Sequence, residues 1–92
     1  MEKWRTYEYE GILIVSIEKL ESMDLFFALS MTSRYLDLFG EEYIIDYIAE
    51  FEGDESNDYE FITNLPFSKF IEINGDCTSF REKDGDFIPY II

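Results

Sequence analysis

Charge constrains this chain more than any other feature of its sequence, because 21 Asp and Glu residues stand against seven Lys and Arg residues. The formal net charge of −14 at pH 7 makes the compact state repel itself, although it keeps the chain soluble. A domain of 92 residues has only a small stability margin against such repulsion. Nucleic acids and anionic membranes carry the same sign of charge, so a basic partner is favoured over either of them.

The composition nevertheless predicts a real fold, one domain spanning residues 1–92. Hydrophobic residues make up 47% of the chain and aromatic residues 18%, well above the values typical of disordered chains. Cys77 is the single cysteine, so no intramolecular disulfide can form and a reducing, cytoplasmic setting fits. No segment is apolar for 18 residues and no signal-peptide core is visible, so we expect neither a membrane span nor secretion.

The N-terminal part of the chain predicts a β-hairpin followed by a helix. Residues 4–9 and 12–17 are rich in β-favouring side chains and are separated by a turn, with the second strand buried on both faces. A helix is expected over residues 23–39, with Ser22 as its N-cap and Gly40 as its C-terminal stop.

A second helix is expected over residues 41–52. On one face, Glu42, Asp46 and Glu50 follow one another at i, i+4 and i+8, which would place their carboxylates in a row about 6 Å apart. The opposite face would carry an apolar stripe at helical spacing. This stripe comprises Tyr43, Ile44, Tyr47, Ile48 and Phe51.

The C-terminal part predicts strands, after a loop over residues 53–57. Asn74-Gly75 and Asp84-Gly85 are typical of tight hairpin turns, and Pro66 and Pro89 indicate breaks or edge positions. The expected strands cover residues 59–63, 69–73, 77–81 and 87–91. The order β-β-α-α-β-β-β-β predicts an α+β domain, an antiparallel β-sheet with two helices packed on one face.

The carboxylates are concentrated in one part of the sequence. No Lys or Arg occurs from Tyr35 to Ser68, whereas ten Asp and Glu residues fall in that window. Ordinary surfaces mix both signs of charge, so this pattern favours a one-sign surface that meets a basic groove. The candidate partner-binding residues are Asp37, Glu41, Glu42, Asp46, Glu50, Glu52, Asp54, Glu55, Asp58 and Glu60.

Catalytic and metal-binding patterns are missing from the sequence. The chain has no histidine, no GxGxxG, no P-loop and no CxxC, and so small a core seldom provides a catalytic cleft, so neither catalysis nor a cofactor is expected. Hydrolysis by a pair of carboxylates stays open as a remote alternative. The segment 54–58 loosely resembles the start of an EF-hand loop. However, Tyr59 stands where that loop requires Gly, and Leu65 stands where it requires Glu, so no specific calcium site is expected.

The many aromatic residues, nine Phe, seven Tyr and one Trp, are interpreted mainly as core. Stacking platforms for single-stranded nucleic acid need a cationic groove, which this composition does not favour. A few rings, with Trp4, Tyr7 and Tyr90 as candidates, would anchor a protein interface. Because a small domain this rich in apolar residues can leave a patch uncovered, a homodimer is expected.

As a profile, the chain resembles the Arn anti-restriction proteins of T-even phages. The resemblance rests on length, charge, the opening WRTYEYEGILIVSIEKL and the acidic stretch EEYIIDYIAEFEGDESNDYE, with no short shared motif. It implies a phage-encoded homodimer in the host cytoplasm whose carboxylates imitate duplex phosphates. The implied targets are the restriction endonuclease McrBC and the histone-like nucleoid protein H-NS, both of which are basic DNA-binding proteins of the bacterial host.

Other functions fit the same sequence. An acidic phage inhibitor could bind a basic patch of another effector, such as a CRISPR nuclease or a polymerase, without mimicking DNA. A soluble accessory domain could carry the charge for solubility alone. Competition with duplex DNA separates the first of these from a DNA mimic, and the absence of any partner would indicate the second.

Overall fold

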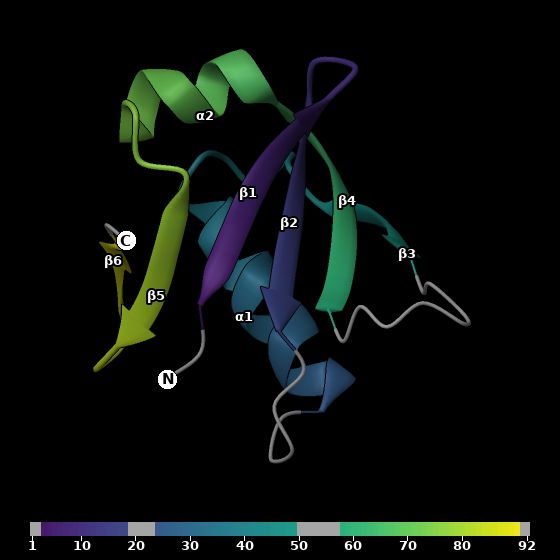
Figure 1. Cartoon of the computed structure of the whole chain (residues 1–92), viewed down its shortest axis with the longest axis vertical. Helices are drawn as coiled ribbons and strands as arrows, with labels where there is room; N and C mark the ends of the chain where they lie inside the picture. Colours follow the sequence, from purple (N-terminus) through teal and green to yellow (C-terminus); the bar gives the residue numbers. More distant parts are fainter. Residues whose placement is uncertain (1–2, 19–23, 50–57, 91–92) are drawn as a thin grey trace.

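Six strands form one antiparallel sheet in the spatial order β3-β4-β2-β1-β5-β6, and two helices accompany it (Figure 1). This computed structural model describes residues 3–18, 24–49 and 58–90. In chain order, the elements are β1 (Trp4–Tyr9), β2 (Ile12–Glu18), α1 (Leu25–Asp37), β3 (Ile45–Ala49), β4 (Asp58–Pro66), α2 (Phe67–Asn74), β5 (Ser79–Lys83) and β6 (Asp86–Pro89).

Strands β1 and β2 form the predicted hairpin at the middle of the sheet. Glu10 and Gly11 have φ angles of 51° and 80°, as a two-residue turn with left-handed backbone requires. Trp4 pairs with Ile17, so alternation along both strands sends the same set of side chains to one face. That face carries Trp4, Thr6, Leu13, Val15 and Ile17, all of which are buried.

Helix α1 covers this buried face and lies behind β1 and β2 in Figure 1. The Trp4 indole N–H donates to the Thr32 hydroxyl at 2.6 Å, which ties the sheet to the helix inside the core. Phe80 of β5 stacks on Trp4 on one side and on Tyr35 of α1 on the other, with ring centroids 5.6 Å and 3.6 Å away. Since Trp4 is fully buried, its predicted role as an interface anchor is wrong.

The first helix was predicted correctly in place, but it is shorter than residues 23–39. Its N-cap is Asp24, whose carboxylate accepts a hydrogen bond from the Phe27 backbone N–H at 2.7 Å. The predicted cap, Ser22, lies outside the described residues. Neither of the helices that the structure describes has the length and apolar character needed to cross a membrane.

The predicted second helix over residues 41–52 is wrong, because residues 45–49 form the edge strand β3. The apolar spacing fits a helix, but Ile45, Tyr47 and Ile48 are also strong strand formers. In the sheet, Ile48 pairs with Phe61 of β4, and a register shift between Ile45 and Tyr47 marks a bulge. Tertiary pairing with β4 therefore overrides the helical pattern.

The predicted strand over residues 69–73 is also wrong, because it forms most of α2. Phe67, Phe70 and Ile71 recur at helical spacing, and this signal could have revealed the helix. Gly75, with φ 64°, ends α2 rather than turning a hairpin. The helix begins at the β1–β2 turn, where the Phe67 N–H donates to the Gly11 carbonyl at 2.8 Å.

The remaining strands agree with the sequence more closely. The strand over 59–63 is confirmed within the longer β4, and the strand expected at 77–81 is shifted by two residues into β5. Asp84-Gly85 makes the predicted hairpin turn, with φ angles of 53° and 88°, and Pro89 ends the edge strand β6.

The α+β prediction of an antiparallel sheet with two helices is confirmed, although the order of the elements is β-β-α-β-β-α-β-β. Both helices contribute to one core: the ring of Phe70 in α2 lies 5.9 Å from Phe39, which directly follows α1. The opposite face of the sheet, turned toward the viewer in Figure 1, carries neither of the two described helices and is called the open face below.

Candidate acidic surface

Four of the predicted partner-binding carboxylates lie close together along the chain where α1 leads into β3. These side chains are exposed, and we call them the acidic corner. Its members are Asp37, Glu41, Glu42 and Asp46. Asp37 is the last residue of α1, Glu41 and Glu42 occupy the turn, and Asp46 lies at the bulge of β3. No Lys or Arg occurs within this segment.

Backbone hydrogen bonds make the turn tight. The Phe39 N–H donates to the Leu36 carbonyl at 3.0 Å as α1 ends, and the Tyr43 N–H donates to the Gly40 carbonyl at 3.1 Å. Phe39 is buried in the core, which anchors the segment between Asp37 and Glu41. The two glutamates therefore project from a loop that is fixed at both ends.

Asn64 of β4 fixes the loop from the other side. Its side-chain oxygen accepts from the Ile44 N–H at 2.7 Å, and its side-chain nitrogen donates to the Glu42 carbonyl at 3.0 Å. Its own backbone N–H donates to the Ile44 carbonyl at 3.1 Å. Three hydrogen bonds from one residue thus position the backbone that carries Glu42.

The Glu42 side chain folds back over Gly40, whose backbone conformation favours glycine. Its φ angle is 144°, in the range that favours glycine, and a Cβ atom there would lie 2.6 Å from a Glu42 carboxylate oxygen. Another residue at position 40 would therefore displace the exposed Glu42 carboxylate and adopt a strained backbone.

Asp58 and Glu60 lie on β4 and are distant from the acidic corner in sequence. Because they are two residues apart on the strand, both side chains point to the open face. Burial, together with the negative charge of Asp58, raises the pKa of the Glu60 carboxyl above its ordinary value. Asp58 also accepts a long hydrogen bond from the Ser16 hydroxyl, at 3.4 Å. Both carboxylates are half-buried, so they offer less free surface than the acidic corner does.

The predicted carboxylate row is wrong, because its i, i+4, i+8 spacing depended on a helix that does not form. Glu42 lies in a turn and Asp46 in a strand, so the two do not share a helical face. The other predicted residues lie outside the described part of the chain. These are Glu50, Glu52, Asp54 and Glu55.

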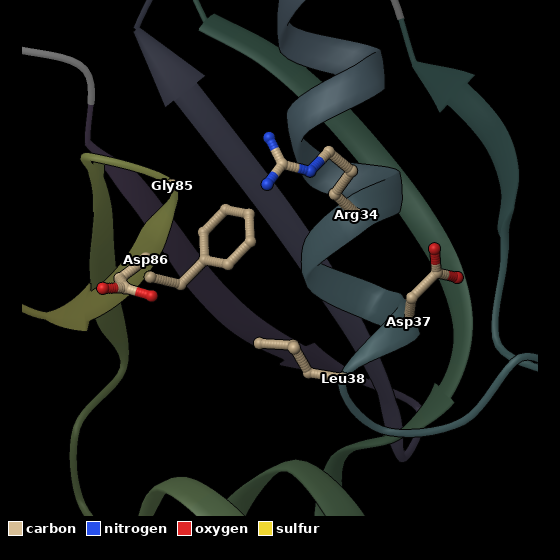
Figure 2. A pocket seen from close by; sticks show the side chains of 6 residues that line it. Arg34, Asp37, Leu38, Gly85 and Asp86 are labelled. Carbon is tan, nitrogen blue, oxygen red and sulfur yellow. The ribbon is translucent and has the colours of Figure 1, made fainter.

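An open hollow lies between the end of α1 and the β5–β6 turn (Figure 2). The Arg34 guanidinium extends toward the strands and lies 5.6 Å from the centre of the Phe87 ring, a cation–π geometry. The Asp37 carboxylate points away from Gly85 and Asp86 in the same view. Asp37 therefore lines the rim of the hollow and also belongs to the acidic corner.

A cationic group near Tyr90 escaped the sequence analysis. The Lys3 ammonium lies 4.2 Å from the centre of the Tyr90 ring, and the Arg81 guanidinium lies 5.8 Å from it. A hydrogen bond and the charge of Lys3, followed by the charges of Arg81 and Arg5, lower the pKa of the Tyr90 hydroxyl. Lys3 and Arg5 are far in sequence from Arg81 and Tyr90. The pairing of β1 with β5, together with the hydrogen bond from the Tyr90 N–H to the Ser79 carbonyl at 2.8 Å, brings them together.

Within the described residues, no three Cys, Asp or Glu side chains are grouped as a metal ion would require. At the acidic corner, the described surface presents exposed negative charge. Comparison of the chain with protein-family models, with curated proteins and with solved structures gives no match.

Proposed function

We propose that this protein is a DNA mimic, an inhibitor that occupies the DNA-binding surface of a basic bacterial protein. The observation that supports the proposal is the acidic corner, in which four exposed carboxylates follow one another without an intervening cation. DNA-binding proteins present Lys and Arg side chains to rows of phosphates, and exposed carboxylates can pair with the same cations.

The fixed backbone of the acidic corner also supports this function. Charged side chains on a rigid loop lose less conformational entropy on binding than side chains on a flexible tail. The Asn64 hydrogen bonds and the buried Phe39 provide that rigidity. Most of the contacts would be exposed ion pairs, so the affinity should fall steeply as salt is added.

The targets in this proposal come from the resemblance to the Arn proteins: H-NS and McrBC, bound by a homodimer in the host cytoplasm. The alternative is an inhibitor that binds a basic patch of another effector, such as a CRISPR nuclease or a polymerase, without replacing DNA. The exposed rings of Tyr7 and Tyr47 give this alternative its support, because aromatic side chains are enriched at protein interfaces.

The direct test is displacement of a labelled DNA duplex from purified H-NS, and from McrBC, measured by fluorescence anisotropy. The site variant carries Asp37→Asn, Glu41→Gln, Glu42→Gln and Asp46→Asn. Its matched control carries the same number of neutralising changes at exposed carboxylates elsewhere, namely Glu8→Gln, Glu10→Gln, Glu72→Gln and Asp76→Asn.

We expect the site variant to be weaker by about fourfold or more, since each of its four exposed pairs contributes about 0.2–1 kcal/mol. The affinity of the control variant should stay within about threefold of that of the parent protein. Its carboxylates affect binding only through the electrostatic field of the net charge. Equal losses in the two sets would show that net charge alone acts. Failure to displace DNA from either target would refute the mimic, and binding without displacement would favour the alternative.

A further inference from the structure

The open face of the sheet carries a continuous apolar row across four strands. Its members are direct neighbours by strand pairing, at the same level of β1, β2, β4 and β3. In that order they are Tyr7, Ile14, Ile62 and Tyr47. Tyr7 is 50% exposed and Tyr47, on the edge strand β3, is 61% exposed. An antiparallel sheet that faces water normally places polar residues on such a face, so this row suggests a docking surface.

Charge is distributed unevenly over the open face, with a cationic half over β1 and β5 and an acidic half over β2, β4 and β3, although Asp86 of β6 pairs with Lys83 in the cationic half. Toward β1 and β5, strand alternation brings four of the seven Lys and Arg residues of the chain to this face. These are Lys3, Arg5, Arg81 and Lys83. Strands β2, β3 and β4 contain no Lys or Arg, and they bring Glu18, Asp58 and Glu60 to the same face.

We propose that the open face binds a second copy of this chain, with a two-fold axis running along β2. Rotation about that axis places β1 of one copy over β4 of the other. Arg5 and Glu60 lie at one level, on either side of Ser16. Each Arg5 would therefore face the partner's Glu60, and each Tyr7 would face the partner's Ile62. Two-fold interfaces need such a self-complementary surface.

A second copy fits this face better than an unrelated protein does. The two-fold rotation places the positive half of each copy over the negative half of the other. Two chains that each carry a charge of −14 repel one another in most orientations. Contact through the open face is the orientation in which the clustered cations meet carboxylates. Face-to-face packing of two sheets, about 10 Å apart, would also cover the apolar row.

This arrangement does not depend on what the acidic corner binds. The corner lies at the end of α1 and in the turn before β3, whereas Arg5 and Glu60 lie on the open face. Glu60 is thereby reassigned from the target-binding surface to the contact between copies. Changes at the two places should consequently have separate effects.

The test is sedimentation equilibrium at concentrations from about 1 µM to about 100 µM, a range that reveals dimers with micromolar dissociation constants. We expect a dimer at the upper end. Arg5→Glu and Glu60→Lys should each weaken it by about 10-fold or more, because like charges then face each other. The Arg5→Glu/Glu60→Lys double variant should return to within about threefold of the parent chain, since the pairing is restored with reversed signs.

Glu8→Lys is the matched control, because it makes the same charge change at an exposed residue of β1 whose side chain alternates away from the open face. It should leave the dimer within about threefold of the parent chain. Circular dichroism of every variant separates dissociation from unfolding. A chain that stays monomeric at the upper concentration would overturn the proposal, as would a dimer that ignores both single changes or fails to recover in the double variant.

Discussion

At the scale of single residues, the Trp4 indole shows how this small core is held together. Trp4 is fully buried, stacks on Phe80 and donates its N–H to Thr32, which is also fully buried. A buried donor that loses its acceptor costs more than an ordinary hydrogen bond contributes, because water cannot replace the lost partner. The Trp4–Thr32 hydrogen bond therefore links β1 to α1 inside the core, where no water can replace a lost partner.

Replacing Thr32 with Val should expose this cost, since Val fills nearly the same volume without the hydroxyl. We expect the free energy of unfolding to fall by about 1–3 kcal/mol, measured by urea denaturation. Ser33→Val, at the exposed neighbouring position of α1, should change it by about 0.5 kcal/mol or less. A Thr32→Val variant as stable as the parent chain would mean that the hydrogen bond contributes nothing.

At the scale of elements, β3 and α2 mark how far the sequence predicts this fold. The β1–β2 hairpin, α1, β4 and the Asp84-Gly85 turn follow from local patterns, and each was predicted near its observed place. The segment at 45–49 carries both a helical spacing and strand-forming residues, and pairing with β4 decides between them. That pairing joins residues distant in sequence, so local patterns could not supply it.

The acidic corner, too, was predicted only in part from local sequence. The sequence located its carboxylates correctly as exposed and without interspersed cations, because composition alone carries that information. It misjudged their geometry, because the helical row required α-helical backbone at Asp46. The cationic half of the open face was missed altogether, since it depends on β5 pairing with β1 across most of the chain.

Asn64 is the residue through which β4 determines the shape of the acidic corner. Asn64→Ala removes both side-chain hydrogen bonds to the loop, and we expect it to lower the free energy of unfolding by about 1–2 kcal/mol. Hydrogen exchange at the Ile44 amide should accelerate, because this amide loses its acceptor. Asn64→Asp retains that acceptor and should preserve slow exchange, whereas equally fast exchange in both variants would contradict the assigned role.

At the scale of the whole molecule, the charge of −14 makes stability depend on pH, and Glu60 gives that dependence a local test. Burial and Asp58 raise the pKa of Glu60 in the folded chain. A carboxyl with a raised folded-state pKa binds its proton more tightly when folded, so its ionised form costs stability above that pKa. The cost disappears as the pH falls through the folded-state pKa and below the ordinary value of 4.5.

Glu60→Gln should therefore stabilise the monomer at pH 7, by less than about 1 kcal/mol, because Glu60 is only half-buried and solvent screens its charge. The advantage should shrink as the pH falls and vanish below the ordinary pKa of the carboxyl. Thermal unfolding of both proteins at about 1 µM, below the expected dimer concentration, measures the monomer. Salt should narrow the difference at pH 7 as well, because it screens the repulsion from Asp58.

The same comparison at about 100 µM joins the pH dependence to the assembly, because a partner's Arg5 facing Glu60 would favour the ionised carboxylate. In the dimer, Glu60→Gln removes an attraction rather than a repulsion, so the variant should become the less stable protein at pH 7. Such a reversal with concentration requires an intermolecular contact at Glu60. In a protein that stays monomeric, Glu60→Gln changes the stability in the same direction at every concentration. An advantage for Glu60→Gln that persists unchanged at high concentration would place the contact between copies elsewhere on the molecule.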